Sequence, residues 1–350
     1  MAAIPYFLIH LTPIVAAIGW WLGGVGLFAT PLYLFVAIPI ADLLAGHDTH
    51  NPADADARGN NPLFNLALRG WVPVQMLMLV GVLAWVGGDS ATAVELGAAI
   101  LALGLMNTSI GINVAHELMH RKSKGDRALA EGLMASVSYT HFCVEHVSGH
   151  HRNVGTPADP ATARLGESVY TFLPRTLWGG VKSAWHLESA RTARRKIPAY
   201  SWANRRLRYP LFLAMAYVGV ALLSGPVGVF VFAAQGAVAF CLLEVINYVE
   251  HYGLAREQLP NGRYESVQPH HSWNSDFRLT NWFLFNLQRH ADHHAHASRP
   301  YWSLRHFPEG PQLPLSYASM VLIALVPPLW RAVMDRRVWI ERRRLMSAAA

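Results

Sequence analysis

The segment TAVELGAAILALGLMNTSIGINVAHELMH, residues 92–120, joins an apolar run of membrane-spanning length to a pair of histidines. From Thr92 to Ala115 the only charged residue is Glu95. A bilayer core about 30 Å thick needs roughly 20 apolar residues in a helix. The run continues into His116 and His120, whose four-residue spacing puts both side chains on one helix face. The stretch therefore predicts a membrane-spanning helix that ends in two imidazoles.

Five further segments have the length and composition of membrane spans. Apolar residues make up 52% of the chain and charged residues 15%, whereas soluble domains carry about 25% charged residues. This composition excludes a disordered chain and argues against a soluble enzyme. Turns at Gly23-Gly24, Gly87-Gly88-Asp89 and Gly225-Pro226 pair the spans as hairpins. We expect an all-α polytopic membrane protein of one domain, residues 1–350, with a helical cap on the cytoplasmic side that holds the metal site. The six expected spans are residues 5–22, 25–44, 71–88, 92–115, 209–224 and 227–249.

Positive charge is confined to one side of this expected topology. All 29 lysines and arginines fall on the side of the two termini, and the expected hairpin turns carry none. Cytoplasmic loops hold the excess of positive charge in membrane proteins. We therefore expect a bacterial inner-membrane protein with both termini and its long polar segments in the cytoplasm. This topology explains the formal net charge of +7, and we expect no nucleic-acid partner because no recognition motif is present.

Nine of the 18 histidines gather in four short patterns at the polar ends of the expected spans. Without a metal, nine buried imidazoles would need nine separate hydrogen-bonding explanations. We therefore expect a metal site built from the segments 116–151 and 251–294. Its candidate ligands are His116, His120, His146, His150, His151, His251, His290, His293 and His294.

Nine ligands are too many for one ion, since tetrahedral zinc takes three or four protein ligands. Imidazole suits zinc, copper, iron and nickel alike, so ligand type alone leaves the metal open. Zinc hydrolysis needs no such number of ligands, and copper more often brings methionine or cysteine into its site, where Met119 is the only methionine nearby. Two metals in a histidine-rich membrane site point instead to oxygen activation.

Acidic residues adjoin several of these histidines. A carboxylate that accepts the second ring N–H of a ligating histidine fixes its tautomer and orientation. Neighbouring helix positions point in different directions, so each carboxylate is expected to orient a histidine of another pattern or to be a charge on a solvated face. The supporting candidates are Glu117, Glu145, Glu250 and Asp292, together with His270 and His271.

Four motifs carry a resemblance to a known family: HELMH at 116–120, EHVSGHHRNVGTPADPATA at 145–163, NYVEHYGL at 247–254 and LQRHADHHAHASRPY at 287–301. They resemble the integral-membrane alkane 1-monooxygenases of the histidine-rich non-haem di-iron superfamily, which also holds the fatty-acid desaturases. The likeness runs from Asp42 to Met334. Desaturases share the short histidine boxes, whereas NYVEHYGL and the GHHRNVGTPADPATA run favour the alkane branch.

The resemblance implies that the nine histidines hold two iron ions, with no bound flavin or haem. It implies hydroxylation of the terminal methyl of medium- to long-chain n-alkanes to primary alcohols with O2. The electrons would come from a rubredoxin that an NADH-dependent rubredoxin reductase reduces. Because Cys143 and Cys241 form no CxxC pair, we expect the rubredoxin to be a separate chain. Its acidic surface would meet basic residues such as Arg191, Arg194, Arg195 and Lys196.

In this family a bulky residue eight positions before the aspartate that ends the second span limits substrate length. Asp42 holds the aspartate position here, so the resemblance assigns the limiting position to Leu34. A leucine is smaller than a tryptophan and should admit longer alkanes. Three alternatives stay open: a fatty-acyl desaturase or hydroxylase, a xylene-type methyl monooxygenase, and a metal transporter or sensor. Against a transporter, Glu244 is the only acidic residue well inside an expected span.

Overall fold

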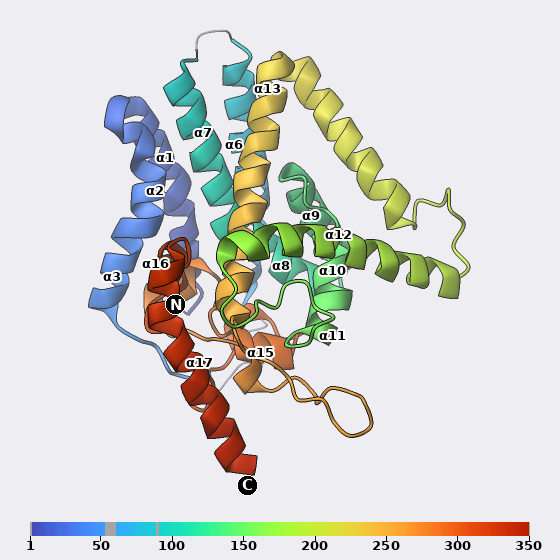
Figure 1. Ribbon diagram of the computed structural model, residues 1–350. Coiled ribbons are helices and arrows are strands. Elements are labelled where there is room, and N and C mark those ends of the chain that lie inside the picture. Colours follow the sequence, from blue (N-terminus) through green and yellow to red (C-terminus); the bar gives the residue numbers. More distant parts are fainter. Residues whose placement is uncertain (1, 53–60, 89–90, 350) are drawn as a thin grey trace.

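The computed structural model describes residues 2–52, 61–88 and 91–349, and the regular secondary structure within these ranges is helical. The expected all-α membrane fold is confirmed (Figure 1). Asp89 of the second expected turn lies outside the described residues. Five helical segments are long and apolar enough to cross a membrane: Ile4–Leu22, Gly24–Ala45, Pro62–Val86, Ala93–Met119 and Arg205–His251.

Most of these segments stand side by side as a bundle at the top of Figure 1, whereas the first half of Arg205–His251 slants away from it. The first two form a hairpin whose helices touch at Gly19, where an added Cβ would collide with the Gly26 carbonyl oxygen. The fourth begins at Thr92, whose side chain and that of Glu95 form a reciprocal capping box. In order, the elements are η1 (Ile4–His10), α1 (Leu11–Leu22), η2 (Gly24–Phe28), α2 (Ala29–Leu32), η3 (Tyr33–Ala37), α3 (Ile38–Ala45), α5 (Pro62–Arg69), α6 (Trp71–Val86), α7 (Ala93–Met106), η4 (Asn107–Ile112) and α8 (Asn113–Met119).

The last two expected spans, 209–224 and 227–249, both lie within α13 (Arg205–His251). Gly225 interrupts the helix with φ 61° and ψ −161°, a conformation open to glycine because it lacks a Cβ. Figure 1 shows the chain reversing direction at this point, so α13 consists of two limbs. The sequence predicted a hairpin here, and the structure forms it with a single residue, Gly225, in non-helical backbone geometry.

A layer of helices and connecting turns lies below the bundle and carries most of the polar residues. α12 crosses the base of the bundle, and α17 runs downward, away from the bundle, to the carboxyl end (Figure 1). The elements of this layer are α9 (Lys124–Ser136), α10 (Phe142–Glu145), η5 (His146–His150), α11 (His151–Asn153), α12 (Val169–Arg194), η6 (Pro269–His271), α14 (Arg278–Phe283), α15 (His290–Ala295), η7 (Tyr301–Ser303), α16 (Tyr317–Ala324) and α17 (Pro327–Ala349).

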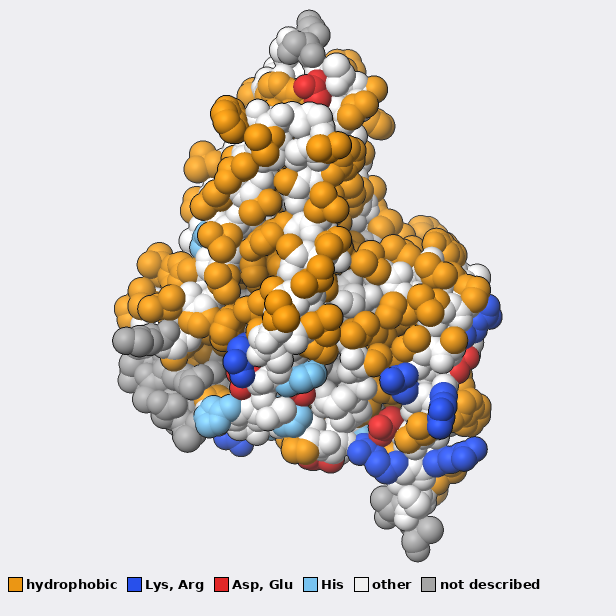
Figure 2. All heavy atoms as spheres, turned by 90° about the vertical axis from the view of Figure 1, so that its left-hand side faces the viewer, with side chains coloured by type: hydrophobic (Ala, Val, Ile, Leu, Met, Phe, Trp, Pro, Cys, Tyr) orange, Lys and Arg blue, Asp and Glu red, His pale blue; other side chains and the backbone are white. Residues whose placement is uncertain are grey.

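The molecular surface follows the same division. Figure 2 shows hydrophobic side chains covering the upper bundle, while arginine, lysine and histidine gather toward the opposite end of this face. Large apolar side chains stand exposed on the bundle, among them Trp21 at 83%, Leu77 at 72% and Leu222 at 85%. Exposed apolar surface on this scale marks a region that faces lipid or another apolar partner. The membrane-embedded part is therefore the bundle, and the polar layer lies at one end of it.

Candidate metal centre

The structure brings all nine candidate histidines together at the junction of the bundle and the polar layer. They form two groups, and within each group the ligating atoms lie within 4.8 Å of one another. The groups adjoin, since the ring centroids of His151 and His294 are 4.5 Å apart. We call them cluster A (His116, His120, His146, His151 and His293) and cluster B (His150, His251, His290 and His294).

Within the clusters the Nε2 atoms face one another at short range. In cluster A the His146 Nε2 lies 3.1 Å from that of His120 and 3.0 Å from that of His151. In cluster B the His290 Nε2 lies 3.2 Å from that of His251 and 3.0 Å from that of His294. With a metal–nitrogen bond of about 2.1 Å, ligands at right angles stand roughly 3.0 Å apart and tetrahedral ligands roughly 3.4 Å. These separations fit imidazoles that share a metal ion, and they lie nearer to the right-angle value than to the tetrahedral one.

Ring nitrogens in both clusters lack ordinary hydrogen-bond partners. The His116 Nε2 and His150 Nε2 atoms are buried and have none among the described residues. Burial, reinforced by neighbouring histidines, lowers the pKa of His146, His151 and His293 well below the usual value. A neutral imidazole keeps the lone pair that a metal needs. The donor set therefore fits metal ions, which would satisfy nitrogen atoms that protein contacts leave unpaired.

Local backbone geometry assigns the histidines to the clusters. His116 and His120 lie on one face of α8 and its end, as their spacing predicts. The segment η5 is a π-helical turn, whose wider winding brings His146 and His151 together in cluster A and directs His150 to cluster B. An α-helix would have paired His146 with His150.

One supporting residue was missed by the sequence analysis. The Asp159 Oδ2 lies 2.9 Å from the His150 Nδ1, and both side chains are buried. Thr162 donates its hydroxyl to the same oxygen at 2.6 Å. This contact aims the His150 Nε2 into cluster B. The available signal was Asp159-Pro160-Ala161-Thr162, because a proline followed by small residues favours a turn that returns the carboxylate toward the histidines.

Of the residues expected to orient the histidines, only Glu250 contacts a cluster. Its Oε2 lies 3.3 Å from the His290 Nε2, and its Oε1 is buried without a partner among the described residues. The Glu145 Oε1 accepts from the Ser183 hydroxyl at 3.4 Å and makes no hydrogen bond to a ligand among the described contacts.

The other two carboxylates, Glu117 and Asp292, bind residues outside the clusters. Glu117 accepts from Arg121 at 3.2 Å. Asp292 is fully buried and binds His296, Arg299 and the Arg305 backbone N–H. These carboxylates join the helices around the site, because arginine offers them a stronger partner than a neutral imidazole does.

His270 and His271 lie outside both clusters. They group with Glu265, whose Oε1 lies 3.1 Å from the His271 Nε2. The His271 Nδ1 accepts from the Gln268 N–H at 2.9 Å, so both of its nitrogens are used.

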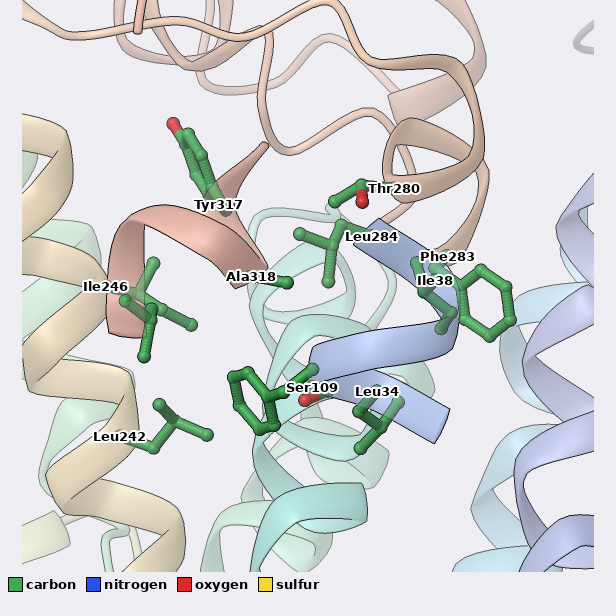
Figure 3. Close-up of a pocket in the computed structure, with 12 residues that line it drawn as sticks. Leu34, Ile38, Ser109, Leu242, Ile246, Thr280, Phe283, Leu284, Tyr317 and Ala318 are labelled. Carbon is green, nitrogen blue, oxygen red and sulfur yellow. The ribbon is translucent and has the colours of Figure 1, made fainter. Parts of the chain in front are cut away.

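Two adjoining pockets, which share Ser109, Ile246 and Leu284 and are together called the apolar cavity, lie between the bundle and the clusters. Its outer part is lined by Leu34 and Leu242, and Figure 3 shows these two side chains with Ser109 and Ile246 around a common space. Ser109 and Ile246 also line the inner part, which reaches His116 and His290. Leu34 is 5% exposed and therefore faces the protein interior. Leu34, the position that the resemblance assigns to the limit on chain length, therefore lines the outer part of this cavity.

Comparison with known proteins agrees with this arrangement. The fatty acid desaturase family model matches residues 91–324. The chain is 44% identical over 317 residues to alkane 1-monooxygenase 2 of Pseudomonas aeruginosa, covering 87% of this chain and 82% of that protein. It is 39% identical over 340 residues to alkane 1-monooxygenase of Ectopseudomonas oleovorans, covering 95% and 84%. It is also 27% identical over 351 residues to the xylene/toluene monooxygenase hydroxylase component of Pseudomonas putida, covering 98% and 91%. The resemblance seen in the motifs is confirmed, and the chain belongs to the alkane 1-monooxygenase family, a branch of the histidine-rich membrane superfamily that includes the fatty acid desaturases.

Proposed function

We propose that the protein is a di-iron monooxygenase that hydroxylates the terminal methyl of medium- to long-chain n-alkanes to primary alcohols. It would use O2 and electrons from a separate rubredoxin, which an NADH-dependent rubredoxin reductase reduces. The observation that carries the proposal is the pair of all-histidine clusters at the inner end of an apolar cavity. The names of the relatives support the same activity.

Iron held by clusters A and B would supply the redox chemistry that activates O2. The chain's own residues position the substrate. Ile112, Leu243 and Leu284 line the inner cavity beside His116 and His290, so they exclude water and present an apolar chain to the metal centre. Each buried CH2 contributes about 0.8 kcal/mol, which favours entry of an alkane from the bilayer.

End-on entry explains attack at the terminal carbon. Methyl C–H bonds are stronger than methylene C–H bonds, so selectivity for the chain end must come from geometry. Leu34 and Phe35 line the outer cavity, whereas the histidines are at the inner end. A chain that lies along this path brings its leading methyl to the clusters, and the outer wall limits how much chain fits.

The two rival reactions of the superfamily use the same metals on other substrates. The outer cavity is lined mostly by aliphatic and aromatic side chains, with Ser109, Thr280 and Tyr317 as its hydroxyl-bearing residues. Among the residues that the structure describes, no lysine or arginine lines either part to receive a carboxylate. An unfunctionalised alkane fits this lining better than a charged fatty acid does. The lower identity to the xylene/toluene relative favours the alkane branch.

The proposal also covers the orientation of the protein in the membrane and the surface that its electron donor contacts. We place the polar layer, both termini and the metal centre on the cytoplasmic side of the inner membrane, following the distribution of lysine and arginine. Of the basic residues expected to meet the electron donor, Arg191 is engaged by Glu188 at 2.5 Å. Arg195 and Lys196 are exposed, so they fit a docking role better than Arg191.

The test uses the purified protein in lipid nanodiscs with iron, rubredoxin, reductase and NADH. We expect iron on elemental analysis, and 1-octanol from octane or 1-hexadecanol from hexadecane. A desaturase or fatty-acyl hydroxylase would release no alkanol but would convert acyl chains. A protein that takes up no iron after loading would contradict the proposal outright.

A further inference from the structure

A second set of cavities adjoins the inner end of the alkane path. An inner polar cavity, which we call the Glu244 cavity, is lined by Tyr139, Glu145, His150, Thr176, Glu244 and Asn247, among others. It shares Phe142 and Asn247 with the inner end of the alkane path. The Glu244 cavity therefore adjoins both cluster B, through His150, and the place where the substrate methyl would lie.

Polar groups in the Glu244 cavity form a connected network. Glu244 accepts hydrogen bonds from the Tyr139 hydroxyl and the Thr176 hydroxyl, each at 2.8 Å, and from the Asn247 amide at 3.2 Å. Glu244 is 3% exposed and belongs to the membrane-spanning helix α13. A carboxylate at this depth is costly to keep and is usually functional in membrane proteins. The alkane path does not use it.

An outer pocket of about 220 Å³ lies beside the Glu244 cavity, toward the molecular surface. Val181 and Trp185 of α12 line it, and Glu188, Arg205 and Arg206 line it as well. The exposed side chains of Val181 and Trp185 mark its mouth, and the ion-paired Glu188 and Arg205 are among the polar groups of a mostly apolar lining. The outer pocket and the Glu244 cavity share one side chain, His141.

His141 has the features of a connecting residue. Its Nε2 is buried and has no hydrogen-bond partner among the described residues. A Cβ built on Gly180 would lie 3.8 Å from this nitrogen and 4.0 Å from the Glu145 Cγ, so His141 and Glu145 flank the same glycine of α12. A neutral imidazole carries one donor and one acceptor nitrogen, and it can therefore join hydrogen bonds on its two sides.

We propose that the outer pocket, His141 and the Glu244 cavity form a polar route that brings protons to the metal centre and lets product water leave. The inference rests on the proposed function, in which R–CH3, O2, two electrons and two protons give R–CH2OH and water. The donor supplies the electrons, and the protons come from bulk water. The apolar wall of the alkane path offers few hydrogen bonds to water or protons. A separate route that carries polar groups would therefore serve the reaction. His141 is a positioning residue on this route.

The first test measures coupling in the iron-loaded protein with rubredoxin, reductase, NADH and octane. Two variants interrupt the route: H141F removes the nitrogens but keeps a ring, and V181W plugs the pocket mouth at an exposed position where folding is not at risk. H186W is the matched control, because His186 is exposed on α12 and lines none of these cavities. We expect 1-octanol formed per NADH oxidised to fall roughly tenfold in H141F and V181W, with peroxide released instead and a larger solvent isotope effect in D2O. H141Q should recover part of the coupling, because it restores a donor and an acceptor.

The second test needs no turnover. In a protein with C143A and C241A, H141C should react with a small charged thiosulfonate added in water, and V181W should slow that reaction while H186W should not. If the parent protein makes no alkanol, the proposed function fails and the labelling still decides whether the route is wet. Unchanged coupling and isotope effect in both H141F and V181W, or an unreactive H141C, would overturn the proposed route.

Discussion

At the scale of single residues, two carboxylate–histidine pairs offer a matched comparison. Asp159 contacts His150 of cluster B at 2.9 Å, and Glu265 contacts His271, outside both clusters, at 3.1 Å. The pairs have similar geometry, but the second ring nitrogen of the histidine has a different environment in each pair. Only the first pair aims a free ring nitrogen at other histidines.

Substituting Asp159 should therefore weaken metal binding selectively. We expect D159N to lower iron affinity by about 10- to 100-fold, because the His150 tautomer and ring orientation lose their partner. E265Q should leave iron binding as in the parent. Iron titration followed by elemental analysis measures both, and equal affinities in D159N and the parent would show that Asp159 does not support the site.

Leu34 gives a second residue-scale prediction. L34W adds an indole to the wall of the outer cavity and should shift the preferred substrate toward shorter alkanes, with little loss on the shortest ones. The measurement is the alcohol yield across a series of n-alkanes. A chain-length profile identical to that of the parent would remove Leu34 from the substrate path.

Sequence reasoning identified the nine clustered histidines but misjudged their surroundings. Histidine spacing is local information, and four patterns at the ends of spans converge wherever the spans pack together. The partners of Glu117 and Asp292 depend on Arg121 and Arg299, whose directions follow from the tertiary fold. The division of the histidines between two clusters also required the backbone of η5.

At the scale of elements, the π-helical turn η5 depends on a glycine. A Cβ on Gly149 would lie 2.7 Å from the Glu145 Oε1, 3.0 Å from the Leu187 Cδ1 and 3.1 Å from the Ser183 Oγ. This close approach lets α12 pack directly on the turn that carries His146 and His150.

Replacing that glycine should disturb both clusters. We expect G149A to lower the iron content and the Tm, because the added methyl pushes Glu145 or α12 away from the turn. G132A is the control: nothing lies within 4 Å of its added Cβ, so it should stabilise α9 by about 0.5–1 kcal/mol. Iron analysis and thermal unfolding separate the two variants, and full iron content in G149A would contradict this role of the turn.

Glu188 connects the end of α12 to the start of α13. It accepts from the Arg191 Nε at 2.7 Å and from the Arg205 N–H at 2.9 Å. Burial alone would raise the pKa of Glu188, but these hydrogen bonds outweigh it and lower the pKa to about 2, from 4.5.

The depressed pKa sets a pH window for this connection. E188Q should unfold at a lower temperature than the parent, because the charged hydrogen bonds are lost. The stabilisation by Glu188 is complete above about pH 4.5 and disappears as the pH falls through about 2. The deficit in unfolding temperature of E188Q should stay constant from pH 7 to about 4.5 and shrink as the pH falls toward about 2. A deficit that grows on acidification would contradict the assignment.

Most elements follow from the sequence, and the exceptions have local causes. Apolar length predicts the spans well because a bilayer requires helices of fixed minimum length. The π-helical turns η3, η4 and η5 carry no comparable signal, since each depends on packing against neighbouring helices. The same holds for the outer pocket between α12 and α13, which no single segment defines.

At the scale of the whole molecule, the charge distribution makes a topological prediction. An alkaline phosphatase inserted after Gly225 should be active, because this turn would face the periplasm and an added Cβ there meets nothing within 4 Å. The same enzyme fused to the carboxyl end should be inactive, and a fluorescent protein fused there should fluoresce. Phosphatase activity at the carboxyl end would invert the proposed orientation.

The two clusters are built from shared segments. The turn at η5 places His146 in cluster A and His150 in cluster B, and α15 divides His293 and His294 in the same way. Binding of one ion would therefore fix the backbone of the segments that also carry the ligands of the second ion. Half-filled molecules should be scarce, and the pair of ions should arrive and depart together as a cooperative unit.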